Sequence, residues 1–217
     1  MKNWWKILAL LLLLFTVIGG FLIEVPNQVI LYETIRNLYF HVPMWFSMIF
    51  LFLLSVIYSV KHLSSSNMEH DLIAKQMVNT GIVFGILGLV TGSIWAKFTW
   101  GAYWTNDIKL NGSAITMLVY FAYLILRSSM DEEQKRGRIA AVYNIFAFVM
   151  LIVFIGVLPR MYDSLHPGNG GNPAFDSYDL DSNMRLVFYP AVIGWILLSL
   201  WIANLNIRLN KLKDKEE

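Results

Sequence analysis

The chain alternates between long apolar stretches and short polar ones. Six stretches contain no Asp, Glu, Lys or Arg, and each is between 17 and 22 residues long. A bilayer core needs roughly 17–25 apolar residues per helix, whereas the strands of a membrane β-barrel alternate apolar and polar residues. The pattern therefore predicts an all-α integral membrane protein, a single domain over residues 1–217 with a bundle of six transmembrane helices. The predicted spans are Ile7–Ile23, Val42–Val60, Gln76–Ala96, Leu110–Leu126, Ile139–Pro159 and Leu186–Ile207.

Composition supports a membrane protein and narrows its chemistry. Hydrophobic residues make up 57% of the chain and charged residues 15%, with a mean hydropathy of +0.54. Soluble domains carry nearer a quarter of charged residues, so a soluble or disordered chain is disfavoured. The chain has no cysteine, which excludes disulfides, thiolate metal sites and covalent haem attachment to this chain. Its histidines are four: His41, His62, His70 and His166.

Basic residues predict the orientation of the helices. If both termini are cytoplasmic, 12 of the 17 lysines and arginines fall on the inner side, as the excess of positive charge on cytoplasmic loops requires. The first span has no evident cleavage site near Gly19–Gly20 and is interpreted as an uncleaved helix. The inner loops 61–75 and 127–138 are too short for a nucleotide-binding domain, and no phosphate-binding loop is present. We therefore expect no ATP hydrolysis by this chain.

Two of the histidines lie on the outer side. His41 precedes the second span and stands two residues before Pro43, which suits the first turn of a helix. A helix N-terminus there would keep the imidazole neutral, the form that binds iron. His166 lies in a segment with Pro167, Gly168, Gly170 and Gly171, so a mobile loop is expected. His62 and His70, in the first inner loop, are interpreted as solvated.

The second outer segment is rich in aromatic residues. Residues 95–104 contain Trp95, Trp100 and Trp104 together with a Phe and a Tyr. An aromatic belt at the membrane interface is one interpretation. Two residues favour a second interpretation, a ligand-binding site. Gly101 allows close backbone approach, and Asp107 places a charge near the hydrocarbon boundary. In that interpretation the aromatic rings hold a flat porphyrin, two histidines are axial ligands and outer cations pair with its carboxylates. The outer cations are Arg36, Lys97, Lys109, Arg160 and Arg185.

These residues resemble a known family. The run Trp100-Gly101-x-Tyr103-Trp104-x-x-Asp107-x-Lys109 is similar to the tryptophan-rich motif of CcmC-type haem-handling proteins of cytochrome c maturation. The segments around His41 and His166 resemble those of that family's two haem-ligand histidines, over nearly the whole chain in order and spacing. At Asn106 the family commonly has a further aromatic residue.

The resemblance implies a function and a site. Such proteins bind haem b at the outer, periplasmic face of the inner membrane and present it to a haem chaperone, CcmE. They associate with an ABC-type complex of CcmA, CcmB and CcmD. Carried over, His41 and His166 would be axial ligands of the haem iron. Trp100, Gly101, Tyr103, Trp104 and Asp107 would form the platform that holds haem, and the protein would be a carrier and not an enzyme.

Three alternatives stay open. A CcsA-like cytochrome c synthase component has a similar motif but usually more spans. A structural subunit of an ABC transporter would use the aromatic residues only as an interface belt. An integral enzyme acting on a lipid or quinone would use His41, His166 and Asp107, but the chain has no recognisable nucleophile motif.

One feature inside a span predicts helix packing. Gly81, Gly85, Gly88 and Gly92 recur three or four residues apart in the third span, so they share one helix face. Small residues at this spacing let a neighbouring helix approach closely. We interpret this face as a packing surface.

Overall fold

The computed structural model describes residues 3–27, 31–166 and 180–213, which are almost entirely helical. Within these described residues, six helices are long and apolar enough to cross a membrane, which confirms the predicted number of spans. The helices are α1 (Trp4–Leu22), the 3₁₀ helix η1 (Tyr32–Asn37) leading into α2 (Leu38–Ser65), α3 (Met68–Trp100), α4 (Ile108–Ser128), α5 (Glu133–Leu151) followed by the π-helix η2 (Ile152–Val157) and α6 (Leu158–Met161), and α7 (Ser182–Lys213).

Most of the helices extend well beyond the apolar stretches. The predicted inner loop 61–75 is wrong in extent, because only Ser66 and Asn67 separate α2 from α3. Ser66 adopts a left-handed conformation (φ 54°), and the Asn67 side chain accepts a hydrogen bond from the Glu69 N–H at 2.8 Å, capping α3. Charged residues end a hydrocarbon span, but they are compatible with helix, so the polar turns at both ends remain helical.

The interpretation of His62 as solvated is also wrong. Its side chain is 2% exposed, and its Nδ1 lies 2.9 Å from the Asn67 carbonyl oxygen. His70 is half-buried, and its Nδ1 lies 3.1 Å from the Ser65 hydroxyl. Both histidines pack into the tight turn between α2 and α3, where an open loop was expected.

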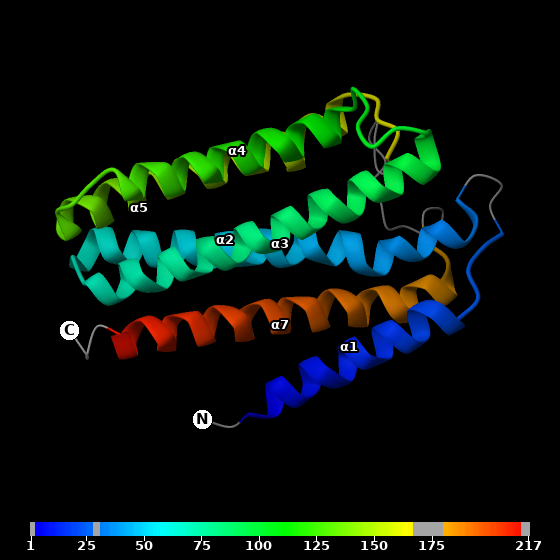
Figure 1. The fold of residues 1–217 in the computed structure, drawn as a ribbon, viewed down its shortest axis with the longest axis horizontal. Helices are drawn as coiled ribbons and strands as arrows, with labels where there is room; N and C mark the ends of the chain where they lie inside the picture. Colours follow the sequence, from blue (N-terminus) through cyan, green and yellow to red (C-terminus); the bar gives the residue numbers. More distant parts are fainter. Residues whose placement is uncertain (1–2, 28–30, 167–179, 214–217) are drawn as a thin grey trace.

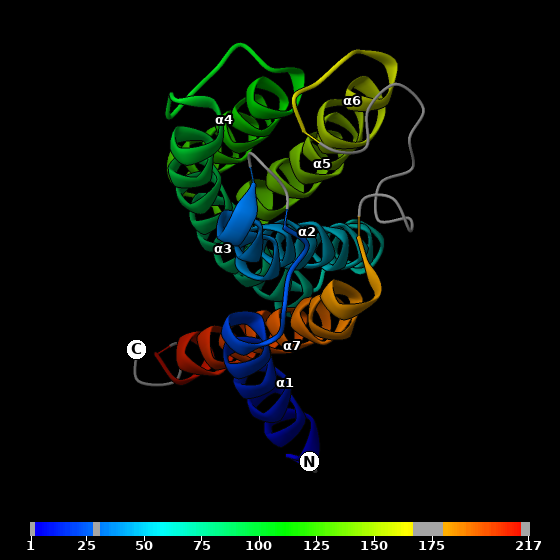
Figure 2. The ribbon, with the colours of Figure 1, turned by 90° about the vertical axis from the view of Figure 1, so that its right-hand side faces the viewer.

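The helices form three layers of antiparallel pairs. Figure 2 shows α4 beside α5 in one outer layer, α2 and α3 in the middle, and α1 beside α7 in the other outer layer. α2 also contacts α5 and α7, so it is the central helix. The core between α2 and α4 includes Phe52 stacked on Tyr120, with ring centroids 3.6 Å apart. Large apolar side chains cover the outside, as along α1, where Leu10, Leu11 and Leu14 are more than half exposed. Lipid tails suit such a surface.

The alternating helices give the bundle two distinct ends (Figure 1). α1 begins and α7 ends at one end, which we call the terminal end. α1, α3 and α6 end at the other, which we call the loop end. His41, the tryptophan-rich segment and His166 therefore meet at the loop end.

Candidate functional site

His41 lies on the central helix, against α3. Helical backbone begins at Tyr32 and passes through η1 directly into α2, so His41 is not at a helix N-terminus and Pro43 is inside the helix. That expectation from the sequence is wrong, because the preceding 3₁₀ turn continues the helix. The His41 Nδ1 lies 3.0 Å from the Gly88 carbonyl oxygen and 3.2 Å from the Thr91 hydroxyl. A carbonyl can only accept, so Nδ1 carries the hydrogen and Nε2 is left with its lone pair.

The glycine face of α3 makes room for this imidazole. A Cβ added to Gly92 would lie 2.5 Å from the His41 Cε1, and one added to Gly88 would lie 2.9 Å from the Trp45 ring. Gly81 receives Phe52 of α2 in the same way, and Gly85 receives Met48 of α2 and Met117 of α4. The predicted close packing is confirmed, and half of the glycine face belongs to the site.

Asp107 organises the segment that carries His166. Its carboxylate caps α4 by accepting hydrogen bonds from the Lys109 and Leu110 N–H groups. It also accepts from the Ser164 hydroxyl at 2.8 Å and from the Leu165 N–H at 2.7 Å, while the His166 Nδ1 lies 3.3 Å away. The residue is only 4% exposed. The Asp107 carboxylate thus links the start of α4 to the segment after α6. Because the His166 Nδ1 faces this carboxylate, the His166 Nε2 points away from it.

Burial and hydrogen bonding set the protonation states of Asp107 and His166. Burial alone would raise the pKa of Asp107, but hydrogen bonds from Leu165 and Ser164 outweigh it and lower the pKa below its usual value. Burial lowers the pKa of His166 to about 4, with Asp107 opposing this and Lys109 adding to it. His166 is therefore neutral at pH 7, which is the form of imidazole that binds a metal. The predicted mobile loop with Pro167, Gly168, Gly170 and Gly171 lies outside the described residues.

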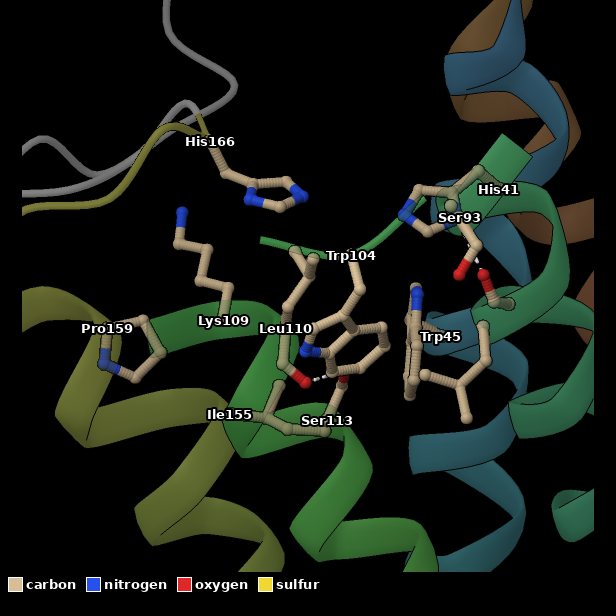
Figure 3. Close-up of a pocket in the computed structure, with 13 residues that line it drawn as sticks. His41, Trp45, Ser93, Trp104, Lys109, Leu110, Ser113, Ile155, Pro159 and His166 are labelled. Atoms are coloured by element: carbon tan, nitrogen blue, oxygen red, sulfur yellow. Dashed lines mark hydrogen bonds between the residues drawn. The ribbon is translucent and has the colours of Figure 1, made fainter. Parts of the chain in front are cut away.

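A single cavity brings the two histidines together. Its volume is about 160 Å³ and its walls come from α2, α3, α4, η2 and α6, with Trp104 from the segment between α3 and α4. In Figure 3 the His41 and His166 rings point toward each other across this cavity. We call it the site cavity; it is lined by His41, Trp45, Gly88, Leu89, Gly92, Ser93, Trp104, Lys109, Leu110, Ser113, Ile155, Pro159 and His166.

The structure separates the seven predicted site residues into groups. His41, His166 and Trp104 line the site cavity. Trp100 packs edge-on against His166, with the ring centroids 4.7 Å apart. Trp100 and Asp107 thus contact His166 but are not among the residues that line the cavity. Gly101 ends α3 with φ 81°, and nothing lies within 4 Å of an added Cβ, so its role is a helix cap rather than close approach. Tyr103 is 61% exposed.

Sequence reasoning missed several lining residues. Trp45 stands one helical turn from His41, a spacing that signals a shared face. Ile155 belongs to the π-helix η2, and π-turns are frequent at functional sites. Among the five outer cations, Lys109 lines the cavity. The other four donate hydrogen bonds to main-chain carbonyls: Arg36, Lys97, Arg160 and Arg185.

The fold and the cavity define a class: multi-pass helical membrane proteins with two histidines facing one apolar cavity at one end of the bundle. The family model for CcmC, described as heme exporter protein C, matches residues 1–217. The chain belongs to the CcmC family.

Individual relatives agree with this family. Heme exporter protein C of Escherichia coli (strain K12) is 27% identical over 138 residues, 64% of this chain and 54% of the relative. The protein of the same name from Bradyrhizobium diazoefficiens is 32% identical over 122 residues, 54% of this chain and 45% of the relative. Cytochrome c biogenesis protein CcsA of Prochlorococcus marinus subsp. pastoris is 38% identical over 93 residues, 43% of this chain and 29% of the relative. The chain thus spans about half the length or less of these curated relatives.

Proposed function

We propose that the chain binds haem b in the site cavity and delivers it to a haem chaperone of CcmE type during cytochrome c maturation. The observation that carries the proposal is the pair of imidazoles. Each has its Nδ1 beside an acceptor, Gly88 O for His41 and Asp107 for His166, and each lines the same cavity. In metal-binding histidines, a hydrogen bond from the ring nitrogen that does not bind the metal orients the imidazole and fixes its tautomer.

The rest of the cavity fits a porphyrin. Trp45, Trp104 and Leu110 supply flat or apolar walls for the ring system. Lys109 supplies one cation for a carboxylate of the porphyrin. The bound group supplies an iron centre, and His41 and His166 would be its axial ligands. A volume of about 160 Å³ is below the roughly 300–1,000 Å³ of pockets that enclose a whole ligand. Part of the macrocycle would therefore remain accessible, as a carrier requires.

The two ligands differ in how they are held. His41 is part of a long helix, whereas His166 belongs to a connecting segment fixed by hydrogen bonds to one carboxylate. We propose that His166 is the ligand that an acceptor displaces: the acceptor's ligand would replace the His166 imidazole, and no covalent bond of the polypeptide would change. In this account the protein is a carrier and not an enzyme.

We further propose that the loop end faces the periplasm and that both termini are cytoplasmic in the bacterial inner membrane. The 12 to 5 distribution of basic residues supports this orientation. An ABC-type complex of CcmA, CcmB and CcmD is the proposed assembly, since two relatives are named heme exporter protein C. One observation favours a second candidate, a CcsA-like synthase component: the 38% identity to CcsA over 93 residues.

Transfer to each acceptor distinguishes these functions. The haem-loaded protein is mixed with a CcmE-type chaperone or with an apocytochrome c, and covalent haem on the acceptor is followed by haem staining. We expect labelling of the chaperone alone, abolished in His166→Ala and reduced in His41→Ala. Labelling of the apocytochrome without a chaperone would establish the synthase function instead. Full transfer by His166→Ala with none by His41→Ala would overturn the assigned order of the ligands.

A further inference from the structure

A second cavity lies at the terminal end, far along the bundle from the haem site. It has a volume of about 300 Å³ and lies between the end of α2 and the beginning of α5. We call it the terminal cleft; its lining residues are His62, Leu63, Ser66, Glu132, Gln134, Lys135 and Arg138. Nothing in the proposed haem function uses it.

The terminal cleft is rich in hydrogen-bond donors and positive charge. Lys135 and Arg138 lie three residues apart on one face of α5, and in the described part of the chain neither makes an ion pair. The neighbouring Arg136, by contrast, pairs with Glu133 at 3.3 Å. Glu132 is the one acid of the lining, and its side chain does not cap the helix. The unpaired N–H groups at the start of α5 therefore add the partial positive charge of a helix N-terminus to that of the two cations.

The floor of the terminal cleft is buried and closely packed. His62 is 2% exposed and is tied through Nδ1 to the Asn67 carbonyl. A Cβ on Gly137 would lie 2.8 Å from the His62 Nε2, so α5 rests directly on this imidazole. Beside it, α3 is joined to α4 by the buried Asp71–Arg127 ion pair, with both nitrogen–oxygen distances 2.7 Å. The cleft is thus built on fixed groups, with its cations at the rim.

The depth of the terminal cleft matches the lipid headgroup region. The apolar stretch of α2 ends at Val60, just before His62, and that of α5 begins at Ile139, just after Arg138. Val60 is 51% exposed and Val142 is 58% exposed, one turn further into the bundle from Leu63 and Arg138. A charged cleft next to exposed apolar helix surface reproduces the order of groups in a phospholipid, headgroup first and acyl chains after.

We propose that the terminal cleft binds the phosphate of an anionic phospholipid, with Lys135 and Arg138 as its ligands and the acyl chains against the exposed apolar helix surface beyond it. Basic clefts between transmembrane helices are known to hold anionic headgroups in this manner. The proposal is independent of haem binding, because the two cavities lie at opposite ends of the bundle.

Lipid binding to the delipidated protein tests the proposal. The full chain in neutral detergent is titrated with phosphatidylglycerol, with phosphatidylcholine and with inorganic phosphate, and bound lipid is measured by native mass spectrometry. We expect phosphatidylglycerol to bind at least about tenfold more tightly than phosphatidylcholine, and Lys135→Gln/Arg138→Gln to remove about tenfold of that affinity. The matched control, Arg208→Gln/Lys213→Gln, removes the same charge from α7 at the same end and should bind as wild type.

Several results would overturn it. One is equal loss in both double variants, which would mean attraction by bulk charge. Another is binding of inorganic phosphate without phosphatidylglycerol, which would assign the cleft to a soluble anion. If the double variant does not fold, as judged by gel filtration, Lys135→Arg/Arg138→Lys replaces it and must retain the preference for phosphatidylglycerol.

Discussion

Asp107 shows how one side chain can serve a site without lining it. It caps α4 and holds Ser164, Leu165 and His166. In the sequence it appeared as a charge among aromatic residues, which suggested contact with the ligand. Its partners on residues 164–166 are more than 50 positions away in the chain, so spacing alone does not reveal the positioning role.

Replacing Asp107 with Asn separates the two roles of this carboxylate. An amide oxygen still caps α4, but the amide cannot accept all the hydrogen bonds from Ser164, Leu165 and His166. We expect haem affinity to fall about 10–100-fold, the usual effect of losing a partner behind a metal ligand, with little change in thermal unfolding. Haem titration followed by absorbance measures this, with Asp163→Asn as the control. Wild-type affinity in Asp107→Asn would refute the positioning role.

The pKa of His166 gives a pH test. A proton competes with iron for the imidazole, so haem affinity falls as pH drops through the pKa of the ligand. With a pKa of about 4, His166 stays neutral at pH 5.5, and we expect its contribution to be nearly unchanged between pH 7 and 5.5. An ordinary imidazole, with a pKa of about 6.5, would lose about tenfold over the same interval. A tenfold loss in a haem titration at pH 5.5 would contradict the burial described for His166.

At the scale of elements, the site depends on how closely α2 approaches α3. The glycines at 88 and 92 were correctly read as a packing face, yet two of the side chains that they admit, Trp45 and His41, line the site cavity. The sequence could indicate that a helix packs there but not which residues it brings. The same holds for η2, since nothing in the apolar run around Ile155 distinguishes a π-helix from an α-helix.

Gly92→Ala tests this dependence. The new Cβ would lie 2.5 Å from the His41 Cε1, so the imidazole must shift or the helices must separate. We expect haem affinity to fall about tenfold or more, measured by titration in detergent. Gly156→Ala is the matched control, because its nearest neighbour would be Ile152 at 3.8 Å. Equal affinities in the two variants would show that His41 does not need this space.

At the scale of the whole molecule, hydropathy predicted the six spans because lipid imposes long apolar helices. It also predicted that His41, the tryptophan-rich segment and His166 share one end, since alternating spans leave no other arrangement. Hydropathy carries no information on the lateral order of helices. The pairing of α2 with α3 and of α4 with α5, which encloses the site cavity, emerges only from the packed bundle.

The central claim is that His41 and His166 together bind haem iron. The most direct measurement is the absorption spectrum of the detergent-purified protein with added haem, together with a pyridine haemochrome assay. We predict a Soret band that weakens or shifts in both His41→Ala and His166→Ala but not in His70→Ala, whose imidazole lies in the turn at the terminal end. A wild-type spectrum in both variants, or no band at all after haem is added, would contradict the account.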